Sequence, residues 1–386
     1  MVWVVALVAL LVVVAITFWL HRRLVVATGL PRGWAVVVDG VLIAGMLLGV
    51  FAFLLGAGLF DPSWARPFGF VGYTWWAVVF YLMLGVLLIG LIALAVRLTA
   101  RLTGAKRPEG PQRWLQLGTA LIVVAALATV GYGLTEANRV QVTEETATIA
   151  KLPRSLDGLR VALITDLHVG PARGVGFTRR VVDEVNAARP DVVILGGDLA
   201  DGTVAAVGPD LEPLRDLVAP MGVYGVSGNH EYLAEDDGGN WLDFWETLGV
   251  VPLRNERVEL RRDGAVIDLA GVYDRTAPDE YAPDSDAALA GRDTSRVLIY
   301  VAHQPLQAED VRGRGVDLQL SGHTHDGQLW PFGYAVALQQ PVVSGFGQVG
   351  DVSVFTSRGT GAWGPPVRVG APPQIVVITL RSPQGH

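Results

Sequence analysis

The segment Asp191–Asp198, with the sequence DVVILGGD, decides the fold of the second half of this chain. Its four apolar residues form a run of the length expected for a buried strand, and the run ends in two glycines and a carboxylate. Glycine allows the backbone to turn sharply directly after a strand. The segment therefore predicts a strand over 191–195, with Asp198 just beyond its carboxyl end.

The same pattern recurs along the chain on both sides of this segment. Short β-rich runs alternate with helical stretches near 175–188 and 210–218, and each run ends in polar or glycine-rich residues. Alternating strands and helices are typical of a layered α/β fold, in which the residues beyond the carboxyl ends of the strands meet in one crevice. The other predicted strands are 160–165, 223–226, 296–302 and 316–320.

Side chains that bind metal ions follow all five predicted strands. A single Asp or His at the start of a loop is usually a turn or cap residue. Here, however, five of the six histidines beyond residue 134 stand at strand ends, so the whole set predicts one site. The candidate metal ligands are Asp166, His168, Asp198, Asn229, His303, His323 and His325, and His230 stands beside Asn229.

The residue types of this set indicate its chemistry. Imidazole nitrogens mixed with carboxylate oxygens suit Mn, Fe or Zn, whereas Ca and Mg prefer shells made of oxygen alone. One aspartate can bridge two ions, so seven ligands are enough for two sites with open positions. Two ions about 3.5–4 Å apart can share and deprotonate a water while they clamp the oxygens of an in-line phosphoryl transfer.

The first 134 residues differ in composition from the rest of the chain. They carry a net charge of +6 against −13 for the remainder, which together give the −7 of the whole chain. Charged residues make up 17% of the chain, below the roughly 25% of soluble domains, which excludes a disordered or fibrous protein and indicates a part in lipid. The absence of cysteine excludes a disulfide scaffold, a thiolate zinc site and a cysteine nucleophile. No nucleic acid is expected as a partner, because the acidic part lacks clustered Lys and Arg.

Four long apolar runs account for the first part. Each is long enough to cross a hydrocarbon core of about 30 Å as a helix, and none shows the charged face of a helix in a soluble bundle. The first run is not expected to be a cleaved signal, because Arg22 and Arg23 follow it instead of preceding it. The runs lie at about 3–20, 40–60, 75–96 and 115–133. The predicted organisation is a transmembrane region over 1–134, a linker and first strand over 135–158, and a soluble α/β domain over 159–386.

The loops between the apolar runs predict the orientation in the membrane. The first loop carries three arginines and the third carries five Lys and Arg, whereas the second loop, at about 61–74, has only Arg66. By the positive-inside rule the first and third loops are cytoplasmic. Four crossings then place the acidic part outside the cytoplasm, on a multi-pass protein of the cell membrane. Tryptophans near the run ends are expected to anchor it at the interface: Trp3, Trp19, Trp34, Trp64, Trp75, Trp76 and Trp114.

Taken in order, the motifs at the strand ends resemble those of the calcineurin-like metallophosphoesterase superfamily. They are Asp-x-His, Gly-Asp, Gly-Asn-His-Glu, a lone His and Gly-His-x-His. The segment Ser321–His325, followed by Gly327-Gln328, resembles the bacterial branch that contains the YkuE-type and YaeI-type phosphoesterases. Multi-span helices ahead of such a domain also resemble the transmembrane proteins with a metallophosphoesterase domain. The resemblance covers about 150–386 and implies an α/β four-layer sandwich (α/β/β/α).

The resemblance also implies a site with two divalent metal ions, of which Mn is expected and Fe or Zn are alternatives. His230 would lie near the leaving-group oxygen as general acid or transition-state stabiliser, and Asn229 is grouped with it as catalytic. Asp198 would bridge the two ions. The first ion would be held by Asp166, His168, Asp198 and His325, and the second by Asp198, Asn229, His303 and His323.

Three further side chains are expected to act around the metal ligands. Arg358 would pair with a substrate phosphate, with a surface salt bridge as the alternative. Glu231 is expected to orient a neighbouring ligand. Asp326 stands where relatives often have glycine, and at the mouth of the site it would disfavour very anionic substrates or add an outer contact to the metal site.

Three segments outside the motifs also have a predicted structure or role. The aromatic residues Trp241, Phe244 and Trp245 are expected to pack on the core, with a lid over an apolar substrate as the alternative. The stretch 273–295 predicts an irregular surface loop. An apolar rim beside the cleft would suit a lipid-linked phosphate; it consists of Trp330, Pro331, Phe332 and Tyr334.

The sequence therefore predicts a membrane-anchored, metal-dependent phosphoesterase. It would hydrolyse a phosphodiester or phosphomonoester, with lipid-linked and cell-wall-linked phosphates among the candidate substrates, through attack by a hydroxide shared between two metals. Two alternatives stay open at this point. One is a non-catalytic metal-binding ectodomain on a membrane scaffold, and the other is a regulatory ectodomain on a transporter. The oligomeric state is left open.

Overall fold

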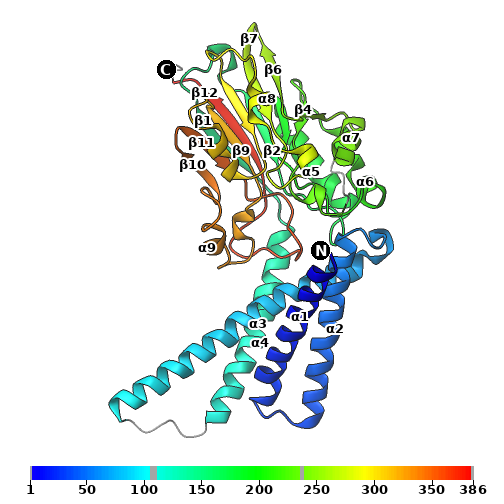
Figure 1. Ribbon diagram of the computed structural model, residues 1–386, viewed down its shortest axis with the longest axis vertical. Coiled ribbons are helices and arrows are strands. Elements are labelled where there is room, and N and C mark those ends of the chain that lie inside the picture. The colour runs from blue at the N-terminus through cyan, green and yellow to red at the C-terminus, as the bar shows by residue number, and fades with distance from the viewer. Residues whose placement is uncertain (1, 105–110, 235–238, 384–386) are drawn as a thin grey trace. The chain divides into compact units, whose positions relative to one another are not determined.

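The computed structural model describes residues 2–104, 111–234 and 239–383, and the chain divides into two compact units (Figure 1). The first unit comprises Met1–Phe53 and Phe68–Gly133. The second comprises Leu54–Pro67 and Leu134–His386. The short segment 54–67 joins two long helices of the chain but packs with the second unit, where Arg66 Nε donates a hydrogen bond to the carbonyl of Gly170 at 3.0 Å.

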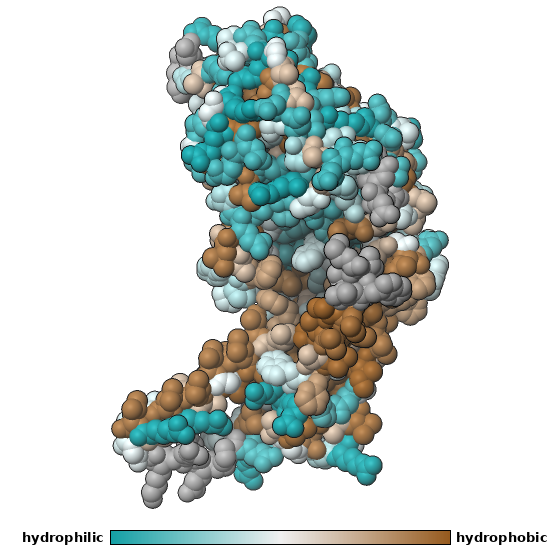
Figure 2. All heavy atoms as spheres, in the orientation of Figure 1, coloured by the Kyte–Doolittle hydropathy of each residue, from teal (hydrophilic) through white to brown (hydrophobic). Residues whose placement is uncertain are grey.

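The first unit is built from four helices that are each long and apolar enough to cross a membrane. The helical assignment of all four apolar runs is thereby confirmed. Their apolar side chains point outward: Leu10, Phe18 and Leu121 are all more than half exposed. Figure 2 shows this surface as brown patches on the helices, whereas the visible face of the second unit is mostly teal. The helices are α1 Val2–His21, α2 Arg32–Gly56, α3 Pro62–Thr103 and α4 Pro111–Ala137.

The third helix differs from the prediction. It spans 42 residues, so most of the stretch 61–74 that was expected to be a loop is helical. Trp75 and Trp76 consequently lie inside the helix and not at its end. They contact α2 where the small residues Gly45 and Gly49 leave room, since a Cβ on either glycine would fall within 2.6 Å of an indole ring. Small residues of this kind allow close approach of helices in a membrane.

The second unit contains two six-stranded sheets. In the first sheet β2 to β5 run parallel to one another, and β12 lies between β1 and β2, parallel to β1 and antiparallel to β2. Its strands are, in spatial order, β1 Gln141–Thr148, β12 Gln374–Arg381, β2 Arg160–Ile164, β3 Val192–Leu195, β4 Val223–Gly225 and β5 Val251–Pro252. The parallel core of the second sheet has an antiparallel strand at each edge. Its strands are β10 Gly345–Val349, β11 Val352–Thr356, β9 Leu318–Ser321, β8 Leu298–Val301, β7 Ala265–Gly271 and β6 Glu256–Arg262.

Side-chain alternation along the strands produces the layers. In β2, Val161 and Leu163 pack against residues of the second sheet, whereas Ala162 and Ile164 face the helices on the other side. The outer face of the second sheet is covered by α8 and by the 3₁₀ segment Pro305–Val311. The expected order of helix, sheet, sheet and helix is thereby confirmed. The remaining helices are α5 Val175–Ala188, α6 Val204–Leu211, α7 Gly239–Thr247, α8 Ser285–Leu289 and α9 Gly333–Val336.

Three segments of the second unit can be compared with their predicted structure. Trp241 and Trp245 are completely buried in the core beside the first sheet, so the packing interpretation holds and they form no lid. The helix predicted near 210–218 begins earlier, as α6, and continues as a 3₁₀ segment to Asp216. The stretch 273–295 is not wholly irregular, because it contains α8 and a 3₁₀ turn.

Candidate metal centre

The candidate site lies at the carboxyl ends of strands from both sheets. The loops after β2, β3 and β4 belong to the first sheet, and those after β8 and β9 belong to the second. Each predicted ligand follows its strand by a few residues. The loops after parallel strands all begin at the carboxyl edge of a sheet, so the polar side chains on them lie at that edge. The loops carry, in chain order, Asp166 and His168, Asp198, Asn229 and His230, His303, and finally His323 and His325.

The backbone in these loops is held in an unusual conformation. Asp166, His168, Asp198, His323 and His325 all have positive φ, between 47° and 71°. Residues other than glycine rarely adopt this region, and such strain gathers at functional sites that the surrounding structure holds in place. Five of the seven predicted ligands thus have the same strained, left-handed backbone conformation.

Glycines beside the ligands allow the loops to approach closely. A Cβ on Gly322 would lie 2.4 Å from Asp166 Oδ2, and one on Gly228 would lie 2.2 Å from Asp198 Oδ1. Any other residue at either position would push a carboxylate out of the site.

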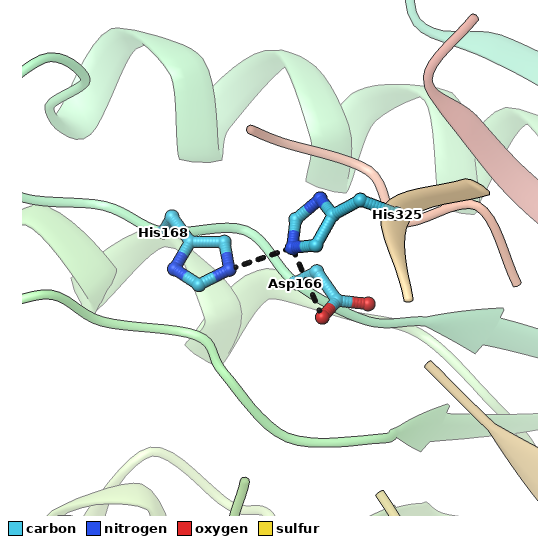
Figure 3. A group of neighbouring side chains, drawn as sticks. All are labelled: Asp166, His168 and His325. Carbon is cyan, nitrogen blue, oxygen red and sulfur yellow. Dashed lines mark hydrogen bonds and ion pairs between the residues drawn. The ribbon is translucent and has the colours of Figure 1, made fainter. Parts of the chain in front are cut away.

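Asp166, His168 and His325 form one half of the centre (Figure 3). The two imidazole Nε2 atoms lie 3.0 Å apart, and His325 Nε2 lies 3.4 Å from Asp166 Oδ1. Figure 3 shows the ring of His325 directed at both partners. Two ring nitrogens at this distance must share a proton or a cation, so the geometry suits a metal ion between them.

Asp198, His303 and His323 form the other half. His303 Nε2 lies 3.1 Å from Asp198 Oδ2, and the same oxygen lies 3.8 Å from His168 Nε2 in the first half. Asp198 therefore stands between the two groups. Asn229 Oδ1 lies 2.9 Å from His323 Nδ1, which brings the seventh predicted ligand into this half.

The hydrogen bonds of His303 test whether the site fits a metal. Its Nδ1–H donates to the carbonyl of Gly196 at 2.8 Å, which leaves Nε2 without a proton in the neutral ring. That Nε2 atom is buried and makes no hydrogen bond of good geometry with the described residues, although Asp198 Oδ2 lies 3.1 Å away. A buried ring nitrogen set against a carboxylate in this way fits two ligands of one metal ion.

Asp201 was missed by the sequence reasoning. Its Oδ1 accepts hydrogen bonds from His168 Nδ1 at 2.9 Å and from His230 Nδ1 at 2.7 Å. This contact fixes both rings with Nδ1 protonated, so that Nε2 of His168 faces the first half of the centre. The signal was present in the sequence as the Asp-Gly pair Asp201-Gly202, three residues after Asp198.

Arg368 is a second residue that no motif indicated. Its side chain is fully buried and donates to the carbonyls of Gly361 and Ala371 and to His325 Nδ1, the last at 3.0 Å. An arginine cannot accept a hydrogen bond, so Nδ1 of His325 is the acceptor. Arg368 thereby orients the ring that Figure 3 places beside Asp166 and His168. Burial and the neighbouring cation Arg173 lower the pKa of Arg368 to about 9.

Glu231 holds two ligand loops together. The buried carboxylate accepts hydrogen bonds from the backbone N–H groups of Asp198, Leu199 and Gly228, at 3.0, 2.8 and 2.7 Å. The loop after β3 is thus tied to the loop after β4. Glu231 orients the backbone of Asp198, one of the predicted ligands.

The charges of the site stabilise one another. Burial alone would raise the pKa of Asp198, but His303, His230 and His168 hold it well below its ordinary value. Burial likewise opposes the charged form of His230, but Asp198 and Asp201 outweigh it and raise its pKa to about 9. His230 is therefore a protonated imidazole at neutral pH in the metal-free protein.

The remaining sequence candidates are Arg358, Asp326 and the expected apolar rim. Arg358 is partly buried, and its Nε has no hydrogen-bond partner among the described residues. Asp326 accepts a hydrogen bond from Ser344 Oγ at 3.1 Å, and burial raises its pKa. Of the expected apolar rim, Trp330, Phe332 and Tyr334 are exposed.

Comparisons with known proteins agree with this geometry. Residues 159–327 match the family model described as calcineurin-like phosphoesterase. The chain is 37% identical over 279 residues to an uncharacterised metallophosphoesterase of Helicobacter pylori, covering 71% of this chain and 72% of that protein. It is 33% identical over 326 residues to the Danio rerio transmembrane protein with metallophosphoesterase domain, covering 80% and 74%. It is also 29% identical over 278 residues to the uncharacterised metallophosphoesterase YkuE of Bacillus subtilis, covering 68% and 94%.

Proposed function

The chain belongs to the calcineurin-like phosphoesterase family, and from this premise we propose that it is a membrane-anchored, metal-dependent hydrolase of phosphate esters. The observation that carries the proposal is the convergence of seven nitrogen and oxygen donors from five loops. Two groups of three among these side chains, and a third group that joins His168 and Asp198 to His230, have ligand atoms within 4.8 Å of one another.

Two divalent ions would occupy the two halves of this centre. Asp198 stands between the halves and would contact both ions. A pair of such ions supplies Lewis acidity to the phosphate oxygens and activates water for attack on phosphorus. Manganese is the proposed metal, with iron or zinc as alternatives, because imidazole and carboxylate ligands suit all three. The ligands would be Asp166, His168, Asp198 and His325 for one ion, and Asp198, Asn229, His303 and His323 for the other.

His230 supplies the proton that the departing alcohol needs. Its Nδ1–H is held by Asp201, which leaves Nε2–H free to donate to the ester oxygen as the P–O bond breaks. Its backbone N–H donates to Asp198 Oδ1 at 2.8 Å, so the ring is fixed beside the centre. Water contributes a hydroxide to phosphorus as the P–O bond to the alcohol breaks, the proton from His230 completes the alcohol, and the other proton of the water is released and restores the charge of His230.

The catalytic domain is proposed to lie outside the cytoplasm. The first and third loops of the helical part carry most of its positive charge, and such loops stay on the cytoplasmic side. The contact of Arg66 with Gly170 supports the number of crossings, because four crossings put the second loop and the domain on the same side of the membrane. An extracytoplasmic phosphate ester, including a lipid-linked one, is the substrate class that this arrangement suits.

Hydrolysis by the purified full-length protein tests the proposal. With added Mn²⁺ we expect turnover of bis-p-nitrophenyl phosphate or p-nitrophenyl phosphate. The variant Asp198→Asn keeps the size of the side chain but removes its charge, and is expected to lose at least a hundredfold in kcat. The matched control Asp216→Asn changes an exposed carboxylate paired with Arg179 and is expected to leave kcat unchanged.

Unchanged turnover in Asp198→Asn would contradict the proposal. So would metal binding by the wild-type protein without turnover of either ester, which is the behaviour of a non-catalytic metal-binding ectodomain.

A further inference from the structure

A cavity of about 840 Å³ opens beside the second half of the metal centre. Asn229 and His323 form one wall, so the cavity begins where the ligands end. Its volume lies in the range of pockets that enclose a whole organic ligand, and it is much larger than the volume of a phosphate group alone. The cavity therefore has room for an organic substituent carried by the substrate phosphate.

The permanent charge on the wall of this cavity is positive. Arg275 is its one permanently charged side chain, and no carboxylate is among the lining residues that the structure describes. The rest of the wall combines apolar side chains such as Leu306 with the amides of Gln304 and Gln340. In a domain with strong net negative charge, a cavity whose described lining carries a cation and no carboxylate is a local exception.

Arg275 itself is available to a ligand. It makes no hydrogen bond or ion pair with any residue that the structure describes, and its side chain is exposed. Most other arginines of the domain are engaged, as Arg257 is with Asp268. Asp310 is near enough for Arg275 to act on the pKa of its carboxyl, but it forms no hydrogen bond or ion pair with the guanidinium. A guanidinium whose N–H groups are not engaged in this way is suited to a planar or tetrahedral anion on the cavity wall.

The loop that carries Arg275 is fixed by its neighbours in the sequence. On one side the fully buried Asp274 accepts two hydrogen bonds from Gln304 Nε2, at 3.1 and 3.0 Å. On the other side both the N–H and the hydroxyl of Thr276 donate to the same carboxylate at 2.7 Å. Gln304 directly follows the predicted ligand His303, so the loop is anchored to the metal centre.

A second amide completes this anchoring. Gln340 accepts a hydrogen bond from the backbone N–H of Leu306 at 3.1 Å and donates to Gln304 Oε1 at 3.4 Å. The position of Arg275 relative to the centre is thus set by a buried network and not by a free surface loop.

We propose that this cavity binds the organic substituent of a phosphodiester and that Arg275 selects a substituent bearing a second anionic group. The inference rests on the proposed hydrolase function and names the substrate class of that same site. The expected substrate has two negative centres, namely the phosphate at the metal ions and a phosphate or carboxylate at Arg275.

Three p-nitrophenyl phosphodiesters test this preference, because all of them release p-nitrophenol from the same bond. Their second substituents are 2-phosphonoethyl, which is anionic and has a stable C–P bond, 3,3-dimethylbutyl, which is neutral, and choline, its cationic counterpart of the same shape. For the full-length wild-type protein with Mn²⁺ we expect kcat/KM to fall in that order. In Arg275→Gln, kcat/KM for the anionic ester is expected to fall about tenfold, the size of one charge-assisted hydrogen bond. The values for the neutral ester are expected to stay within about twofold.

A matched control separates local from general effects. Arg179→Gln removes an arginine that pairs with Asp216 on the surface of α5, and is expected to preserve the order of all three esters. Equal losses for all three esters in Arg275→Gln, or no loss for the anionic one, would overturn the subsite while leaving the hydrolase standing. Absence of turnover of every ester by the wild-type protein would contradict the hydrolase and the subsite together.

Discussion

Asp201 links two histidines with different proposed tasks. One carboxylate oxygen accepts from His168, a proposed ligand, and from His230, the proposed acid. The burial of His230 opposes its positive charge, yet Asp198 and Asp201 raise its pKa to about 9. An acid catalyst works in its protonated form, so activity should fall on the alkaline side as His230 loses its proton.

The variant Asp201→Asn tests this role. The amide oxygen still accepts from both rings, but the negative charge is lost, so the pKa of His230 should move down toward its ordinary value. We expect kcat to fall about ten- to a hundredfold and the alkaline limb of the kcat–pH profile to shift to lower pH, with KM nearly unchanged. An alkaline limb at the same pH in both proteins would show that Asp201 does not control the charge of His230.

The predictability of the site differed from residue to residue. The seven proposed ligands stand at the ends of predicted strands, and Asp198, Asn229 and His323 directly follow a glycine, so local sequence was enough to place the set in one group. Asp201 had a visible signal, but its importance depends on a histidine 33 positions earlier. Arg368 had no signal, because its contact with His325 joins positions 43 residues apart. The left-handed backbone of five ligands was also beyond prediction, since tertiary contacts impose it.

At the level of elements, Glu231 connects the loops after β3 and β4. Glu231→Ala would leave the buried N–H groups of Asp198, Leu199 and Gly228 without an acceptor. An unsatisfied buried donor costs about 1–3 kcal/mol, so with partial relaxation we expect a loss of about 3 kcal/mol. This corresponds to a fall in Tm of about 8 °C for a domain of this size, measured by scanning fluorimetry in detergent with a metal chelator present.

The matched variant Glu231→Gln retains one side-chain oxygen and should lose about half as much. If Glu231→Ala melts at the same temperature as the wild-type protein, the carboxylate does not hold the two loops together.

Some elements could be predicted from the sequence and others could not. The strands β2, β3, β4, β8 and β9 are apolar runs with clear ends, and all five were expected. The edge strand β6 is mostly polar, because part of it faces solvent, so hydrophobic pattern did not indicate it. In β12 the apolar run is clear, but nothing local shows that the last strand inserts between β1 and β2. The extra length of α3 lies beyond its most apolar part, where hydropathy does not mark a helix end.

At the scale of the whole molecule, the proposed topology makes a labelling prediction. The chain has no cysteine, so a single introduced one reports its own location. Thr294→Cys lies on the exposed surface of the second unit, and Thr103→Cys lies at the end of α3, beside the third loop. In bacterial spheroplasts that express each variant, a membrane-impermeant maleimide should label Thr294→Cys at once and Thr103→Cys only after permeabilisation. The reverse pattern would invert the orientation and place the catalytic domain in the cytoplasm.

The most direct test of the central claim is anomalous diffraction from crystals of the full-length protein grown with Mn²⁺. We predict two anomalous peaks about 3.5–4 Å apart, one beside Asp166 and His325 and the other beside Asn229 and His303, with Asp198 contacting both. Crystals that contain Mn²⁺ yet show no peak among these side chains would contradict the account, because the five loops would then converge without forming a metal centre.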